Sequence, residues 1–432
     1  MTEIADVRTP RTIPAGVVAV VCLLGAAAVY WHLFEMPIWD KAYGLFGNGI
    51  DLRVYRGGGF AVWNDRPLYD APVYRVWDFT YTPFAALVMV PLAFLSIPHA
   101  ETLMHVVNLV ALVLFVFLSL RALNFRRDGR FWLTLAAFSV GATIIDPIHS
   151  TIWQGQINLV LGVLVLGCLT LPMGRWRGIG VGLAAGIKLT PMFFVLYLAI
   201  TRRWRAVAVT VLTFAATVVL GLIVLRGEAW EYWTVTLHET SRIGPETWPQ
   251  NQSINGFFDR LRSTGVWRSP NWIWLPVSTV VALSALWAAL RAHRAGAELL
   301  AISIVGMASC GVGPFAWQHH WVWLAPLLLV GIVQAVDATR RARPLTWLWW
   351  LAPLALMLLA YSWVQVFPDK TRFGSYIRFW TPHPHGWSGV LTVVTSGAYP
   401  LVLIVTIALT LWWTRGRTAQ TRQAAGDEVA AA

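Results

Sequence analysis

Charged residues are scarce in this chain of 432 residues. Only 12% of them are Asp, Glu, Lys or Arg, whereas about a quarter is usual for a soluble domain, and 57% are hydrophobic. Several apolar runs reach about 18 residues or more, the length that a helix needs to cross a bilayer. This combination excludes soluble multidomain, disordered and disulfide-rich secreted proteins. It predicts an all-α polytopic membrane protein.

Lysine and cysteine are scarce as well. Only Lys41, Lys188 and Lys370 are lysines among the 33 basic residues, so arginine dominates the formal net charge of +12. Many of these arginines lie in short loops and tails, where they would orient the chain in a membrane, so no nucleic-acid partner is expected. The three cysteines lie inside apolar runs without metal-ligand spacing. Tryptophan is abundant instead: many of the 26 lie near span ends, as in interfacial belts, although carbohydrate-handling proteins also expose aromatic faces.

The apolar runs predict about twelve transmembrane or re-entrant helices. The first has no small-residue cleavage pattern and is interpreted as a retained span rather than a signal peptide. The predicted spans are 13–34, 82–97, 100–121, 131–147, 157–172, 178–200, 204–226, 272–291, 298–313, 321–337, 345–366 and 390–414.

Arginine-rich loops in the C-terminal half place both termini in the cytoplasm. Strict alternation would then put the arginines of 126–130 and 175–177 outside, against the positive-inside rule. Two segments are therefore candidates for incomplete crossing: 82–97, which is short and contains two prolines, and 178–200. The second is interrupted by polar and proline residues, and such backbone is tolerated at membrane depth only where it lines a cavity or is buried in protein. We expect a re-entrant or broken helix around Lys188.

The long segments 35–81, 227–271 and 367–389 are predicted outer loops, and they contain most of the 21 carboxylates. Asp51 lies in a polar island of the first loop, shortly after the first span. A carboxylate near an apolar boundary has a raised proton affinity and can act as a general base toward a hydroxyl. Since Asp is also a favoured N-cap residue, Asp51 could instead cap the helix that follows.

Two further groups are ionisable. His319 and His320 lie at the outer end of a predicted span; adjacent side chains on a helix point about 100° apart, so the pair is a poor metal site. It could transfer a proton, donate to a phosphate, or belong to an interfacial belt. Lys188 is the only lysine within a predicted span. A buried ammonium needs a counter-charge such as a lipid phosphate, unless it snorkels to the interface.

Amide side chains occur at two further places in the sequence that could contribute to a binding site. Gln156 and Asn158 stand at the start of a predicted span, and Asn251 and Gln252 lie in the second long loop. Amides hydrogen-bond sugar hydroxyls without needing charge, although each could equally be a cap or a turn residue. The sequence contains no P-loop, dinucleotide fingerprint, GxSxG elbow or HExxH motif, which argues against soluble-nucleotide chemistry.

Six short motifs occur in order between about residues 45 and 330, and jointly they resemble glycosyltransferase family 87. This family comprises polyprenyl-phosphate-mannose-dependent α-(1→2)-mannosyltransferases of mycobacteria and their relatives, with a GT-C membrane fold. The lead-in to His319 departs from the Ser-rich pattern of the family. The motifs are Asp51-Leu52-Arg53-Val54-Tyr55, Tyr81-Thr82-Pro83-Phe84, Gly155-Gln156-Ile157-Asn158, Ile187-Lys188-Leu189-Thr190-Pro191, Asn251-Gln252-Ser253 and His319-His320-Trp321-Val322-Trp323.

The resemblance implies an inverting transferase in the plasma membrane, with its site on the extracytoplasmic face. It implies a GT-C catalytic domain over 13–414, a cytoplasmic tail over 1–12 and a disordered cytoplasmic tail over 415–432. The implied donor is polyprenyl-phosphate-mannose, and the acceptor is a glycolipid or lipoglycan such as a phosphatidylinositol mannoside, lipomannan or lipoarabinomannan. No cofactor and no obligatory metal are expected.

The same resemblance assigns roles to residues. Asp51 matches the aspartate regarded as catalytic, with His319 or His320 as an alternative base that Asp51 would orient. Lys188, Arg53 and one of the histidines would bind the leaving phosphate. The remaining candidates for substrate binding are Tyr55, Gln156, Asn158, Asn251 and Gln252. Two alternatives stay open: a GT-C transferase of another lipid-linked sugar, and a transporter or flippase of polyprenyl lipids.

Overall fold

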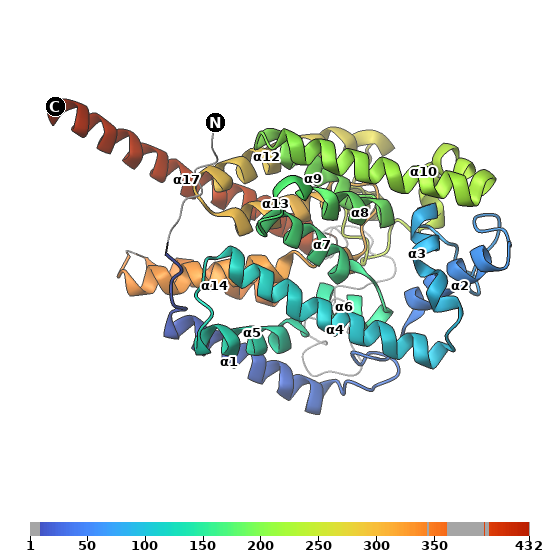
Figure 1. Cartoon of the computed structure of the whole chain (residues 1–432). Helices are drawn as coiled ribbons and strands as arrows, with labels where there is room; N and C mark the ends of the chain where they lie inside the picture. Colours follow the sequence, from blue (N-terminus) through green and yellow to red (C-terminus); the bar gives the residue numbers. More distant parts are fainter. Residues whose placement is uncertain (1–8, 344, 361–392, 394–396, 432) are drawn as a thin grey trace.

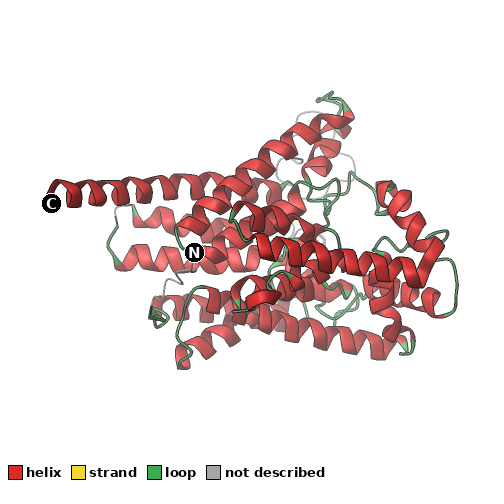
Figure 2. Cartoon of the chain, turned by 45° about the horizontal axis from the view of Figure 1, so that its top comes forward, coloured by secondary structure: helices red, strands yellow, loops and turns green. Residues whose placement is uncertain are grey.

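The computed structural model describes residues 9–343, 345–360, 393 and 397–431. Regular structure within these ranges is helical, with loops and three isolated β-bridges between the helices (Figure 2). The α-helices are α1 Ala15–Tyr30, α2 Ile50–Trp63, α3 Pro83–Ala93, α4 Ile97–Ala122, α5 Gly129–Ala142, α6 Asp146–Gln154, α7 Asn158–Thr170, α8 Ile179–Ile187, α9 Phe194–Ile200, α10 Trp204–Thr234, α11 Ile254–Ser263, α12 Trp274–Arg294, α13 Glu298–Gly311, α14 Leu324–Arg340, α15 Thr346–Ala360 and α17 Ala398–Ala431.

Five helical segments among the described residues are long and apolar enough to cross a membrane, which makes this an all-α membrane protein. They are Ala15–Glu35, Ile97–Ala122, Trp204–His238, Asn271–Arg294 and Ala398–Arg415. Five more apolar helices are shorter, with 10–17 residues. One of these is α3, whose 11 residues extend only about 16 Å, so it is too short to cross the hydrocarbon core by itself.

The helix predicted over 178–200 is broken, as expected from its sequence. Helix α8 ends at Ile187, Lys188 is extended with φ −145° and ψ 128°, and a 3₁₀ turn begins at Thr190 before α9. Pro191 explains the break, because it has no N–H to donate to the carbonyl of Ile187 four residues earlier, and its ring would clash with that carbonyl in a continuous helix. Thr82, the N-cap residue of α3, stabilises the break, since its hydroxyl donates to the carbonyl of Gly186 at 2.5 Å.

Two boundaries differ from the prediction. The second outer loop was expected to begin at 227, but α10 continues to Thr234 and only kinks at the expected boundary, where Arg226 has φ 35° and ψ −102°. The backbone of α17 is helical to Ala431, where a disordered tail had been expected, and it extends beyond the other helices (Figure 1). The predicted third outer loop, 367–389, lies outside the described residues, as do parts of the predicted spans 345–366 and 390–414.

Helix α6 is the element around which the polar residues gather. It lies centrally in the molecule (Figure 1) and contacts α2, α4, α7 and the 3₁₀ turn Gln318–His320, here called the histidine turn. At its end Gly155 adopts φ 69°, and a Cβ there would come within 2.7 Å of the Cβ of Leu52. The glycine thus allows α2 to approach the chain that leads into α7, which brings the first loop next to the 155–158 motif.

Candidate active site

Asp51 lies in the first turn of α2 and is not its cap. The N-cap position belongs to Gly49, which has φ 65° and makes no side-chain cap hydrogen bond, so the capping interpretation of Asp51 is wrong. Tyr55 follows four residues later and therefore projects from the same face of the helix. Asp51 is partly buried and Tyr55 fully buried, so this face of α2 points into the protein.

Gln156 connects this face to the loop before α3. The hydroxyl of Tyr55 donates to Gln156 Oε1 at 2.5 Å, and Gln156 Nε2 donates to the hydroxyl of Tyr81 at 3.0 Å. The rings of Tyr55 and Tyr81 are 4.8 Å apart, and Asn108 on α4 donates to the Gln156 carbonyl at 2.9 Å. The amide is thereby held in one orientation beside Asp51.

Lys188 enters from the break between α8 and α9. Its Nζ donates to Asn158 Oδ1 at 3.2 Å and lies 5.5 Å from the centre of the Tyr81 ring, a cation–π distance. An ammonium held by an amide and an aromatic face inside the protein is not snorkelling to the interface. The hydrogen bond leaves the remaining N–H groups of Lys188 for a ligand.

Burial raises the pKa of Asp51 from 3.8 to about 6, against opposing contributions from the Gln156 hydrogen bond and the positive charge of Lys188. The carboxyl is therefore mostly ionised at neutral pH while its proton affinity is high for an aspartate. Such a group is suited to accept a proton from a hydroxyl.

The histidine turn faces the same centre. His319 is only 2% exposed, so it does not belong to an exposed interfacial belt. Both ring nitrogens of His319 and Nδ1 of His320 are buried without a hydrogen-bond partner among the described residues. Burial, reinforced by the charge of Lys188, holds the pKa of both imidazoles well below its usual value. Neutral rings with unpartnered nitrogens are available to a polar ligand.

Arg53 is not brought to this centre. It follows Asp51 by two residues, so it points to another side of α2. Its guanidinium instead forms an ion pair with Glu101 at 2.5 Å and donates to the carbonyl of Asn48 at 2.8 Å.

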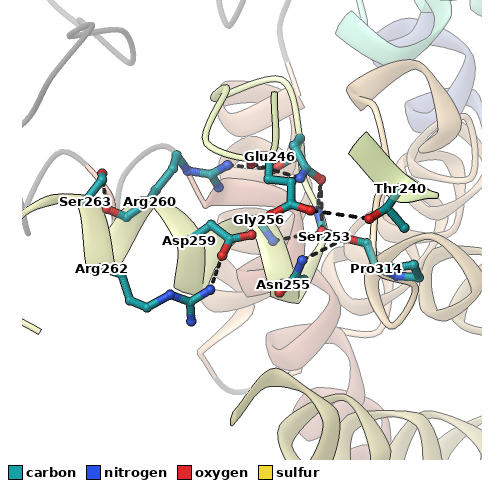
Figure 3. Close-up of polar contacts among 11 residues, drawn as sticks. Thr240, Glu246, Ser253, Asn255, Gly256, Asp259, Arg260, Arg262, Ser263 and Pro314 are labelled. Atoms are coloured by element: carbon teal, nitrogen blue, oxygen red, sulfur yellow. Dashed lines mark hydrogen bonds and ion pairs between the residues drawn. The ribbon is translucent and has the colours of Figure 1, made fainter. Parts of the chain in front are cut away.

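Asn251 and Gln252 are also occupied within the protein. Asn251 Oδ1 accepts hydrogen bonds from Ser253 and from the backbone of Ala316, while Gln252 Nε2 donates to the carbonyl of Pro249. Ser253 and Asn255 both donate to the carbonyl of Pro314 at 3.2 Å (Figure 3). These amides hold the second loop against residues 314–316, and their sugar-binding role stays a prediction.

Two further functional candidates are not apparent from the sequence alone. In the sequence Tyr81 is only one residue of a short motif, but in the structure its hydroxyl accepts from Gln156 and its ring lies against Lys188. Asp146 is fully buried on α6, where it accepts a hydrogen bond from Tyr399. Its position inside a mostly apolar stretch was the one local signal, since a buried carboxylate needs a partner.

Fold and site together define an all-helical membrane protein in which a carboxyl group, an ammonium and two neutral imidazoles converge on a polar centre. The sequence model of glycosyltransferase family 87 matches residues 79–314, which is more than half of the chain. The protein belongs to glycosyltransferase family 87.

Curated relatives support this assignment. A polyprenol-phosphate-mannose-dependent alpha-(1-2)-phosphatidylinositol mannoside mannosyltransferase of Mycobacterium tuberculosis is 34% identical over 320 residues, covering 69% of this chain and 74% of the relative. A polyprenol-phosphate-mannose-dependent alpha-(1-2)-phosphatidylinositol pentamannoside mannosyltransferase of Mycolicibacterium smegmatis is 33% identical over 401 residues, covering 90% and 93%. No solved structure matches the chain.

Proposed function

We propose that the protein is an inverting α-(1→2)-mannosyltransferase that moves mannose from polyprenyl-phosphate-mannose to a hydroxyl of a phosphatidylinositol mannoside or a related lipoglycan. The observation that carries the proposal is the convergence of Asp51, Lys188 and the histidine turn in a chain whose relatives carry that activity in their names. A base and a phosphate-binding group are the two functions that this transfer needs.

In the proposed reaction Asp51 takes the proton of the acceptor hydroxyl as its oxygen attacks the anomeric carbon of mannose. The new oxygen–carbon bond forms on one face of the sugar while the bond to the lipid phosphate breaks on the other, so the β-linked donor gives an α-linked product. The lipid phosphate leaves with the bonding electrons. Lys188, together with a ring N–H of His319 or His320, stabilises that negative charge.

Residues around this centre would hold the sugar. Asn158 has an Nδ2 group that is buried without a partner, while its Oδ1 accepts from Lys188. This amide can donate to a mannose hydroxyl without disturbing the lysine. Gln156 and Tyr55 form the wall beside Asp51 and keep the carboxyl in place.

The proposal includes the membrane arrangement. A GT-C architecture in the plasma membrane would place the first loop, the break at Lys188 and the histidine turn on the extracytoplasmic side, where a polyprenyl-phosphate sugar is available. The concentration of carboxylates in the outer loops and of arginine in the opposite loops supports this orientation. The tails 1–12 and 415–432 would then be cytoplasmic.

The test is transfer by the purified protein in liposomes. Radiolabelled mannosyl-phospho-polyprenol and a phosphatidylinositol mannoside acceptor should yield a product that an α-(1→2)-mannosidase cleaves. Transfer of a different lipid-linked sugar, or movement of the lipid across the bilayer without transfer, would refute the proposal. The glycolipid profile of a strain that lacks the protein then identifies the natural acceptor.

A further inference from the structure

A second buried polar group, Asp146 with its partners, lies on and around helix α6, which contacts the histidine turn. Asp146 at the start of α6 is fully buried, and its two carboxyl oxygens accept hydrogen bonds from Tyr399 at 2.6 Å and Ser150 at 3.1 Å. Tyr399 belongs to α17, 253 residues further along the chain, and is itself fully buried. The proposed reaction uses neither residue.

Helix α6 contacts the histidine turn, and α17 contacts the residue that follows it. From α6, the hydroxyl of Thr151 donates to the carbonyl of His319 at 3.2 Å. From α17, the ring of Tyr399 packs 5.6 Å from that of Trp321, the residue that follows His320. Since both ring nitrogens of His319 have no partner among the described residues, these backbone and neighbour contacts hold the turn.

These contacts form a closed ring of interactions, here called the positioning ring. It passes from Asp146 along α6 to Thr151, across to His319, on to Trp321, and through Tyr399 back to Asp146. The hydrogen bond from Tyr399 to Asp146 closes the ring between two helices that are distant in sequence. At 2.6 Å between two fully buried side chains, it is a short hydrogen bond that water does not compete for.

We infer that the hydrogen bond between Tyr399 and Asp146 positions the histidine turn for its interaction with the leaving phosphate. Tyr399, Asp146 and Thr151 are then positioning residues, which act on the reaction through His319, whose carbonyl accepts from Thr151. The inference rests on the proposed function. It also explains how a C-terminal helix that lies outside the family match at 79–314 contributes to the site.

A purely structural role of the hydrogen bond between Tyr399 and Asp146 can be distinguished from a positioning role by experiment. The bond satisfies a buried carboxylate, so its loss lowers the stability of the fold in either case. Only a positioning role links that loss to the histidines. If the bond acts through His319, removing it should matter less once the imidazole is gone, and a double-mutant cycle measures this coupling.

The experiment uses the full-length protein in liposomes with mannosyl-phospho-polyprenol as donor. Tyr399→Phe, which removes one hydroxyl and keeps the ring beside Trp321, should lower kcat/KM about tenfold in the wild-type background. In the His319→Ala background the same change should lower it less than twofold. The melting temperature should fall equally in both backgrounds, because the structural part of the effect does not depend on the imidazole.

Two further variants keep the test decisive if Tyr399→Phe does not accumulate. Thr151→Val replaces the hydroxyl with a methyl group and so opens the positioning ring at its other hydrogen bond, and it should show the same dependence on His319. Ser150→Ala removes the local hydrogen bond to Asp146 but leaves the link to α17, and it should stay within about twofold of wild type.

Three results would overturn the inference while leaving the proposed function intact. One is wild-type kcat/KM in both Tyr399→Phe and Thr151→Val, the second is an equal loss in the two backgrounds, and the third is a tenfold loss in Ser150→Ala. Failure of the wild-type protein to transfer mannose would instead refute the proposed function.

Discussion

The most direct consequence of the site is the pH dependence of the reaction. Burial raises the pKa of Asp51 from 3.8 to about 6, and the base must be ionised to accept a proton. About 91% of the carboxyl is ionised at pH 7 but only about 9% at pH 5, so kcat/KM should fall about tenfold between these values. A carboxyl with an ordinary pKa would remain more than about 90% ionised at pH 5 and leave the rate almost unchanged.

The fall in kcat/KM toward low pH is the acidic limb of the pH–rate profile. The histidines should not contribute to it. The pKa of both His319 and His320 is held well below its usual value by burial, and then by the charge of Lys188. Burial therefore favours the neutral form of both imidazoles over the range in which Asp51 titrates. The acidic limb is therefore assigned to the carboxyl of Asp51. The rates of the Asp51→Asn and Asp65→Asn variants test this assignment.

The assay is the initial rate of mannose transfer in liposomes between pH 4.5 and 8, at donor concentrations well below KM. Asp51→Asn should lower kcat/KM at pH 7 by about 10² to 10⁴, the usual contribution of a general base, and its residual rate should lack the acidic limb. Asp65→Asn is the matched control, because Asp65 is exposed just beyond the other end of the same helix. A flat wild-type profile down to pH 5, or an undiminished limb in Asp51→Asn, would refute the assignment of Asp51 as the base.

Three more predictions follow from the same contacts. Lys188→Met should raise the KM for the donor and move the acidic limb to higher pH, because the ammonium lowers the pKa of Asp51; an unmoved limb in the pH–rate profile would contradict this. Asp51→Asn should raise the melting temperature at pH 7.5 but not at pH 4, since a folded-state pKa above 3.8 makes ionisation destabilising only above about pH 4. The full effect of that pKa difference is about 3 kcal/mol and the partial exposure reduces it to about 1–2 kcal/mol, so an equal change at both pH values in a thermal-shift assay would refute the burial argument. Tyr55→Phe should lower kcat about fivefold, because the loss of its hydrogen bond to Gln156, worth about 1 kcal/mol, frees the amide beside the base; the kinetics of purified protein at matched expression test this, and a wild-type kcat would count against it.

Some features of the site could be predicted because their cause is local. The break at Lys188 follows from Pro191 and the polar residues around it, and the structure has it where the sequence predicted it. Asp51 and the histidine pair could be selected because ionisable groups in a chain with so few charges need a reason to lie beside apolar segments.

The orientation of side chains could not be predicted in the same way. Arg53 belongs to the same motif as Asp51, yet it pairs with Glu101 on α4 and not with the polar centre. The amides of Gln156 and Asn251 look equivalent in the sequence. Gln156 holds the tyrosines beside Asp51, whereas Asn251 is occupied by hydrogen bonds from Ser253 in its own loop and from the backbone of Ala316.

The sequence by itself determined the class of the protein, an all-helical membrane chain, because the bilayer restricts composition and backbone hydrogen bonding residue by residue. It also supplied the short group of residues that could carry chemistry. Only the tertiary structure decided which of them meet, and it added Tyr81 and the pair of Asp146 and Tyr399. The physical reason is that two residues 253 positions apart cannot be recognised as hydrogen-bond partners from local sequence spacing. They come into contact only when the helices pack together.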